Sequence, residues 1–246
     1  MSKSFKDKKS LQMKIVSNLI LGVLVLSVGA LCLSPIDESV SAEVEGAELY
    51  RSAEKNPSGV SLMFNVYWGT EEVYDILDIL SVNEAKATFF IGGCWADDNT
   101  DCLRAIYAAG HEIGNHGYFH KAHETLDLIG NQKEIADCNR FIELALGEAP
   151  TLFAPPSGAY NDNTLKACRA LNMKTILWSK DTIDWRDKDS SLIYTRATKN
   201  VKAGDFILMH PMRATVDALG DILKYYQANS LKAVTVSENL QEKEKI

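Results

Sequence analysis

Short apolar runs alternate with amphipathic stretches along most of this chain, and this alternation constrains the fold more than any other feature. Val60-Ser-Leu-Met-Phe64 and Ala87-Thr-Phe-Phe-Ile91 have the pattern of buried strands, and each precedes a segment with apolar residues at helical spacing. Apolar strands that alternate with helices form parallel sheets covered by helices. The expected strands are 60–64, 87–91, 111–115, 151–154, 174–178, 205–209 and 232–235, and the expected helices are 71–80, 101–109, 131–146, 163–171, 190–200 and 215–228.

About seven such units predict an α/β fold, namely a parallel (β/α) barrel that is incomplete. An open doubly wound sheet is the alternative. No Gly-x-Gly-x-x-Gly or Walker-type loop follows any expected strand, so the sequence does not support a nucleotide-binding site.

The N-terminal region has the pattern of an export segment. Five lysines between Lys3 and Lys14 precede a mostly apolar run from Ile15 to Leu33, which is roughly long enough to cross a bilayer as a helix. Val40-Ser41-Ala42 offers small residues for a signal peptidase. We expect residues 1–42 to be a cytoplasmic basic tail with a signal peptide or membrane anchor, residues 43–58 a short linker, and residues 59–240 the folded domain. That domain would be exported, either secreted or anchored outside the plasma membrane.

The charge balance limits the kinds of partner that the chain can bind, and the cysteines limit its possible disulfide bonds. Beyond residue 42 the chain has 21 basic and 30 acidic residues, a balance that argues against sequence-independent binding of nucleic acid. In an oxidising compartment Cys94, Cys102, Cys138 and Cys168 allow three pairings. Cys94 with Cys102 is the preferred pair because the two bracket a polar loop. The alternative is that some are ordinary buried thiols, Cys138 and Cys168 in helices.

His116 and His120 are the clearest candidate metal ligands. Two imidazoles four residues apart can point the same way from one helical turn and hold one ion; the alternative is that the spacing arose by chance. Special residues also follow other expected strands, where the loops of a parallel barrel converge on one rim. These are Asn65, Pro155-Pro156, Asp181 and His210. His111 and His123 are not assigned to the site, the first being expected inside a strand and the second in solvent.

Four segments then appear in a fixed order: His116-x-x-x-His120, Ala154-Pro-Pro-Ser-Gly158, Asp181-Thr-Ile-Asp-Trp185 and Leu208-Met-His210. Together they resemble the motifs of polysaccharide deacetylases of the NodB-homology type, carbohydrate esterase family four, over roughly Val60 to Val236. The resemblance implies a catalytic domain in residues 59–240 that removes N-acetyl groups from cell-wall or chitin-like glycans. The partners expected are therefore a glycan, no nucleic acid, and a membrane only through the N-terminal segment.

The resemblance also implies roles for individual residues. His116 and His120 would bind a divalent ion, usually zinc, which polarises the acetamide carbonyl. His210 would protonate the departing amine, and Asp181 would orient His210. Substrate contacts are implied for Trp185 as the wall of the sugar groove, for the backbone N–H of Ser157 at the oxyanion, and for Pro156, Asp184 and Leu208.

The first motif departs from the family. Asn65 stands at the position of the catalytic base, Val66 at that of the third metal ligand, and Ala154 at that of an arginine that pairs with the base. An amide does not take up a proton near pH 7, and an isopropyl group does not bind zinc. The losses are coordinated, because an arginine without its aspartate would be an unpaired charge. Three interpretations remain: a deacetylase with altered metal chemistry, a glycan-binding protein without turnover, and a metal-dependent hydrolase of another amide or ester.

Overall fold

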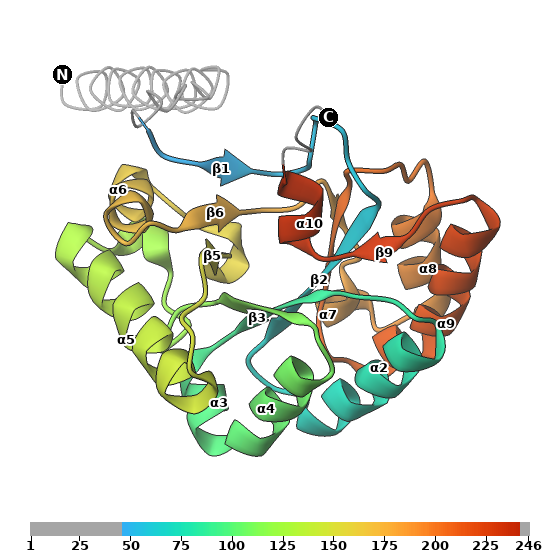
Figure 1. The fold of residues 1–246 in the computed structure, drawn as a ribbon, viewed down its shortest axis with the longest axis horizontal. Coiled ribbons are helices and arrows are strands. Elements are labelled where there is room, and N and C mark those ends of the chain that lie inside the picture. The colour runs from blue at the N-terminus through green and yellow to red at the C-terminus, as the bar shows by residue number, and fades with distance from the viewer. Residues whose placement is uncertain (1–45, 242–246) are drawn as a thin grey trace, which may run out of the picture. The chain divides into compact units, whose positions relative to one another are not determined.

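In the computed structural model, which describes residues 46–241, a curved sheet of parallel strands carries helices on its outer side (Figure 1). The strand order is β1-β6-β5-β4-β3-β2-β8-β7, with β9 paired to the start of β2. The sheet therefore ends at β1 and β7, and the expected incomplete barrel is confirmed. The strands are β1 (Leu49–Tyr50), β2 (Val60–Val66), β3 (Thr88–Ile91), β4 (Glu112–Asn115), β5 (Leu152–Phe153), β6 (Lys174–Ile176), β7 (Lys180–Asp181), β8 (Phe206–Met209) and β9 (Ala233–Val234).

Alternate residues of β2 point to opposite sides of the sheet. Phe64 and Val66 belong to the large apolar cluster under the helices, whereas Met63 belongs to a smaller cluster inside the barrel. All seven residues of β2 are buried. A strand covered on both faces is mostly apolar, and the two polar residues of β2, Ser61 and Asn65, alternate with the residues that face the large outer cluster.

The longer helices cover the outer face of the sheet, as the helical spacing predicts, whereas the short α10 packs Val236 and Leu240 against the inner cluster (Figure 1). The predicted helices are confirmed within a few residues, and α3, α7 and α10 are additional short helices. The bounds are α2 (Thr70–Val82), α3 (Gly93–Asp98), α4 (Thr100–Ala108), α5 (Leu128–Leu146), α6 (Asp162–Ala170), α7 (Asp184–Asp187), α8 (Ser190–Thr198), α9 (Arg213–Ala228) and α10 (Val236–Leu240).

The start of the described chain is part of the sheet, so the expected linker over residues 43–58 is wrong for this stretch. Strand β1 pairs with β6, and the chain then reaches the opposite side of the sheet, where Ser52 forms an antiparallel bridge with Asp205. Ala53 N–H donates to Gly204 O at 2.8 Å. A Cβ on Gly204, whose φ is +92°, would come within 2.2 Å of Ala53 O, so only glycine permits this crossing. We call residues 51–58 the crossing segment.

The predictions for residues 1–42 lie outside the described residues. Within residues 46–241 no helix combines the length and apolar character needed to span a bilayer. All four cysteines of this part of the chain are free, so the preferred Cys94–Cys102 disulfide is wrong. Cys102 is buried on α4, where burial raises the pKa of its thiol to about 11.

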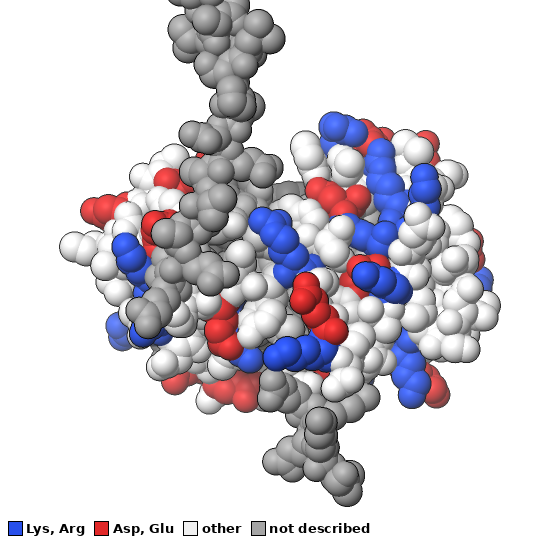
Figure 2. All heavy atoms as spheres, turned by 90° about the horizontal axis from the view of Figure 1, so that it is seen from above, with Lys and Arg blue, Asp and Glu red and all other residues white. Residues whose placement is uncertain are grey.

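The surface charge is mixed. Figure 2, which views the molecule from the side of β1 and α10, shows lysine and arginine interspersed with aspartate and glutamate. On the described part of this face no continuous basic stripe is present.

Candidate active site

The predicted rim residues meet at the carboxyl ends of the strands. Phe64 of β2 pairs with Met209 of β8, so Asn65 and His210 follow at neighbouring positions. On the other side Val66 pairs with Ile91, which pairs with Asn115 of β4, and His116 comes next. Asn65 lies near the middle of this rim.

His116 and His120 come together, but not on a helical turn as their spacing suggested. The segment between them is a loop in which Gly117 has φ +76° and His120 has φ +54°, both left-handed. The two rings are nevertheless 5.0 Å apart between centroids. His116 Nδ1 lies 2.7 Å from Ala154 O, a contact that requires a proton on Nδ1 and leaves Nε2 as an acceptor. Burial lowers the pKa of His116 to about 3, so its imidazole is neutral at ordinary pH.

Glu134 of α5 holds this histidine loop, and the sequence interpretation missed it. Its side chain is 3% exposed; Oε2 accepts the Phe119 N–H at 2.8 Å, and Oε1 lies 2.9 Å from Lys121 Nζ. The Asn115 side chain holds the other end by accepting the Gly117 N–H at 2.7 Å. A carboxylate is costly to bury without such partners. In the sequence, Glu134 lies in an expected helix, and nothing in that pattern indicates a contact with the loop between His116 and His120.

His123 is buried, which contradicts the expectation that it lies in solvent. Its Nδ1 lies 2.7 Å from Asn131 Oδ1, whereas its Nε2 has no partner among the described atoms. Burial lowers the pKa of this imidazole. A Cβ on Gly117 would lie 3.1 Å from His123 Nε2, so the ring packs directly beneath the histidine loop.

His210 is paired with Asp184, not with Asp181 as the motif suggested. His210 Nδ1 lies 2.7 Å from Asp184 Oδ1, and the His210 backbone N–H donates to Oδ2 at 2.6 Å. Asp184 also accepts from Thr215 Oγ1 at 2.7 Å and from the Trp185 N–H at 2.8 Å. The carboxylate is fully buried, so the expected contact of Asp184 with substrate is wrong as well.

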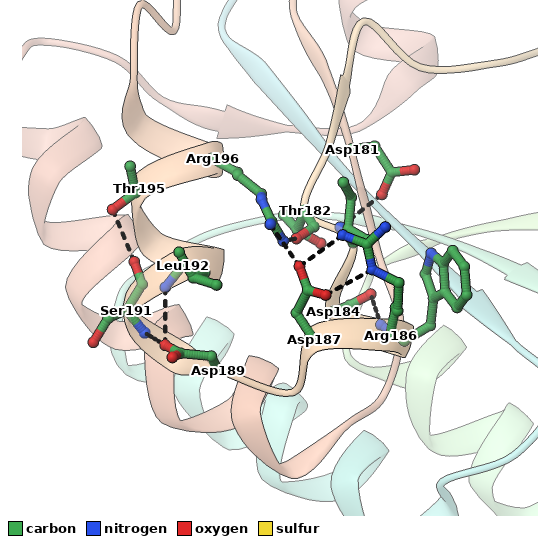
Figure 3. A network of polar contacts seen from close by, with 12 residues as sticks. Asp181, Thr182, Asp184, Arg186, Asp187, Asp189, Ser191, Leu192, Thr195 and Arg196 are labelled. Atoms are coloured by element: carbon green, nitrogen blue, oxygen red, sulfur yellow. Dashed lines mark hydrogen bonds and ion pairs between the residues drawn. The ribbon is translucent and has the colours of Figure 1, made fainter.

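Asp181 stabilises the turn that follows it in the chain. Its Oδ1 accepts the Ile183 N–H at 2.7 Å, and burial raises the pKa of the carboxyl group. In Figure 3 its carboxylate lies apart from the cluster in which Asp187 bonds to Arg186 and Arg196. Arg196 also donates to Thr182 O at 2.8 Å, so this cluster fixes the segment between β7 and α8.

Two aromatic residues that follow the first motif pack against the site histidines. Tyr67 packs on His120 with ring centroids 4.8 Å apart, and Trp68 stacks on His210 at 5.6 Å with ring planes 6° apart. Neither residue was predicted to belong to the site; the signal available was their position directly after β2. Asn65 Oδ1 is buried and has no hydrogen-bond partner among the described residues.

Val66 does not face the two histidines. It is fully buried and belongs to the large apolar cluster on the outer side of the sheet, opposite to Asn65. Ala154 is also fully buried, in the inner cluster. An arginine at this position would be a buried charge facing a neutral Asn65.

Some of the residues predicted to contact substrate are exposed to solvent, and others are buried. Trp185 is 50% exposed, and Ser157 is exposed in a 3₁₀ turn, Pro156–Gly158, where its φ is 57°. Pro156 is buried and Leu208 is only 3% exposed within β8. The side chains of Pro156 and Leu208 therefore have too little surface for the substrate contacts expected of them.

The donor set fits a divalent ion incompletely. Within residues 46–241 no group of three His, Cys, Asp or Glu side chains is arranged to hold a metal. His116 and His120 provide two imidazoles, and Asn65 Oδ1 is an unpartnered buried acceptor on the same rim. Two neutral nitrogens with an amide oxygen form a weaker set than the three protein ligands typical of a catalytic zinc site.

The chain is similar in sequence and in structure to several known proteins. A family model described as polysaccharide deacetylase matches residues 52–176. The uncharacterized protein YlxY of Bacillus subtilis is 32% identical over 85% of this chain and 66% of its own length. A peptidoglycan-N-acetylglucosamine deacetylase of Bacillus cereus is 34% identical over 68% of this chain and 81% of its own. Among solved structures, BA3943 of Bacillus anthracis, a CE4 family pseudoenzyme, is 33% identical with a TM-score of 0.77, covering 80% of this chain and 70% of that one.

Proposed function

The chain belongs to the polysaccharide deacetylase family, and from this premise we propose that it hydrolyses the acetamide bond of N-acetylated, cell-wall or chitin-like glycans outside the cytoplasm. The buried Asp184–His210 pair at the rim carries the proposal. Its hydrogen bonds fix the imidazole through Nδ1 and leave Nε2 for a substrate. The names of the relatives, peptidoglycan and chitin deacetylases, support the substrate class and the location.

His210 performs the proton transfer in this proposal. Attack of water on the acetamide carbon forms a C–O bond, and cleavage of the C–N bond releases acetate and a free amine. His210 takes the proton that the water loses and gives it to the amine, while Asp184 stabilises the transient imidazolium. Asn65 cannot accept a proton near pH 7, but its unpartnered Oδ1 can accept a hydrogen bond and so orient the water.

A divalent ion, zinc by analogy with the family, would be held by His116 and His120. When bound there it would act as a Lewis acid toward the acetamide carbonyl. The contact between His116 and Ala154 O favours this role, since it directs the Nε2 lone pair away from the backbone partner. The weak third donor predicts modest affinity for the ion.

A glycan-binding protein without turnover is the second candidate. The absence of a carboxylate at Asn65 and the outward packing of Val66 favour it, as does the similarity to the pseudoenzyme BA3943. A mutant of BA3943 is described as having restored enzymatic activity, so in that protein the fold supports catalysis once the site is changed.

Acetate release separates the two candidates. Purified protein is incubated with acetylated chitooligosaccharides and with peptidoglycan, each with zinc, cobalt or nickel. Release that is lost in His210→Ala and reduced in His116→Ala supports the hydrolase. Glycan binding without acetate release under any metal condition would support the binding protein and refute the hydrolase.

A further inference from the structure

Trp68 is the least expected component of the rim, because neither the catalytic proposal nor the metal-site proposal requires it. It follows β2 directly, and one face of its indole lies parallel to the His210 ring at 5.6 Å. The side chain is nevertheless 41% exposed. An indole covered on one side and open on the other presents a flat apolar surface to solvent.

The position of this indole is fixed from two directions. Trp68 Nε1 donates to the Sδ of Met212 at 3.2 Å, two residues beyond His210. The next residue, Gly69, has φ +78°, and a Cβ there would come within 2.3 Å of Pro211 O. The turn after β2 is therefore packed against the loop after β8. Preorganisation of this kind reduces the entropy lost when a ligand binds.

Trp185 is the second exposed indole connected to the same pair of residues. It is 50% exposed, and its backbone N–H donates to Asp184, the partner of His210. The Asp184–His210 pair thus supports Trp68 through ring stacking and Trp185 through the backbone. The pair therefore contacts the ring of one exposed tryptophan and the backbone of another.

We propose that Trp68 is a glycan-binding residue whose outer face packs against the C–H face of a pyranose ring beside His210. This rests on the proposed function for the class of ligand. Aromatic faces of this size contribute strongly to binding when one side is already desolvated. Because the other face of the indole stacks on His210, the indole lies between this sugar and the imidazole, and Trp68 holds a sugar next to the place of proton transfer and not at it.

The test measures the affinity of the full-length protein for the β-1,4-linked N-acetylglucosamine tetramer by calorimetry. We expect Trp68→Ala to weaken binding by about tenfold or more, and Trp68→Phe, which keeps an aromatic face, to weaken it only a few-fold. Tyr107→Ala is the matched control, because Tyr107 is 39% exposed on α4, away from the rim, and should bind like wild type. Circular dichroism establishes that each variant is folded.

The outcomes separate this inference from the hydrolase proposal. Folded Trp68→Ala that binds the tetramer as tightly as wild type overturns the inference, as does wild-type protein that binds no tetramer. Trp68-dependent binding without acetate release refutes the hydrolase but supports the sugar contact. Acetate release with unchanged affinity in Trp68→Ala supports the hydrolase and refutes the sugar contact.

Discussion

The rim beside β8 and the rim beside β4 differ in how completely their polar groups are satisfied. At β8, both oxygens of Asp184 accept hydrogen bonds and orient His210. At β4, the imidazoles of His116 and His120 lie edge to face in a loop with two left-handed residues, and Asn65 Oδ1 has no partner in the described chain. Buried polar groups are ordinarily paired, so an unpaired one marks a place where a group has been lost or a ligand is expected.

The difference separates two tasks of amide hydrolysis. In the proposed hydrolase, the half assigned to proton transfer keeps a preorganised imidazole, whereas the half that would polarise the carbonyl lacks a charged third ligand among the described residues. Proton transfer without carbonyl activation gives slow chemistry, while sugar binding needs neither. The following variants test how far the two halves are independent.

The largest effect is expected from Asp184→Ala. It removes a fully buried carboxylate and leaves the His210 and Trp185 N–H groups and the Thr215 hydroxyl without partners. Breaking a buried pair of this kind costs about 3–5 kcal/mol in the free energy of unfolding, measured by urea denaturation. Asp181→Ala is the control, since it loses one local hydrogen bond and should cost only about 1 kcal/mol. Equal losses would show that the two carboxylates are equivalent.

Val66→Asp and Asn65→Asp should have different effects on stability and on zinc affinity, although the two positions are adjacent. The carboxylate that Val66→Asp introduces would lie in the outer apolar cluster, so this variant should lower the free energy of unfolding by roughly 3 kcal/mol. Asn65→Asp places a charge on the inner side of the rim and should tighten zinc binding by about tenfold in calorimetry. Tighter zinc binding from Val66→Asp alone would contradict the orientation of β2 described above.

Glu134→Leu tests whether the histidine loop depends on its buried carboxylate. The variant leaves the Phe119 N–H unpartnered and should cost about 2 kcal/mol of stability, with weaker zinc binding. Lys121→Ala removes only a half-exposed ion-pair partner and should cost less than about 1 kcal/mol. If zinc affinity is unchanged in Glu134→Leu, the loop is held without Glu134.

A smaller effect than that of Glu134→Leu is expected from Arg196→Ala, which removes hydrogen bonds that hold the segment between β7 and α8. Arg196 bonds to Asp187 at 2.6 Å and to Thr182 O at 2.8 Å, and its side chain is partly exposed. We expect a loss of roughly 1 kcal/mol and a reduced rate of acetate release, with zinc affinity unchanged. A change in zinc affinity would mean that the two halves are coupled.

The strands and most helices were predictable because their apolar periodicity reports burial directly. The sequence did not predict which carboxylate bonds to His210. Asp181 and Asp184 are three residues apart, and the left-handed conformation of Ile183 decides that Asp184 reaches the imidazole. The loop geometry of His116 and His120 was equally hidden, because it depends on Glu134 from α5. The burial of His123 likewise depends on a distant partner, Asn131.

The crossing segment has a consequence for the order of folding. Strand β1 and Ser52 find their partners only in β6 and next to β8, so the earliest part of the domain is stabilised by some of the latest. Contacts this distant in sequence are slow to form. A chain that emerges N-terminus first therefore holds β1 without its sheet partner until β6 has been made, and Ser52 and Ala53 without theirs until residues 204–205 have been made. During that interval this stretch is open to incorrect pairing with other chains.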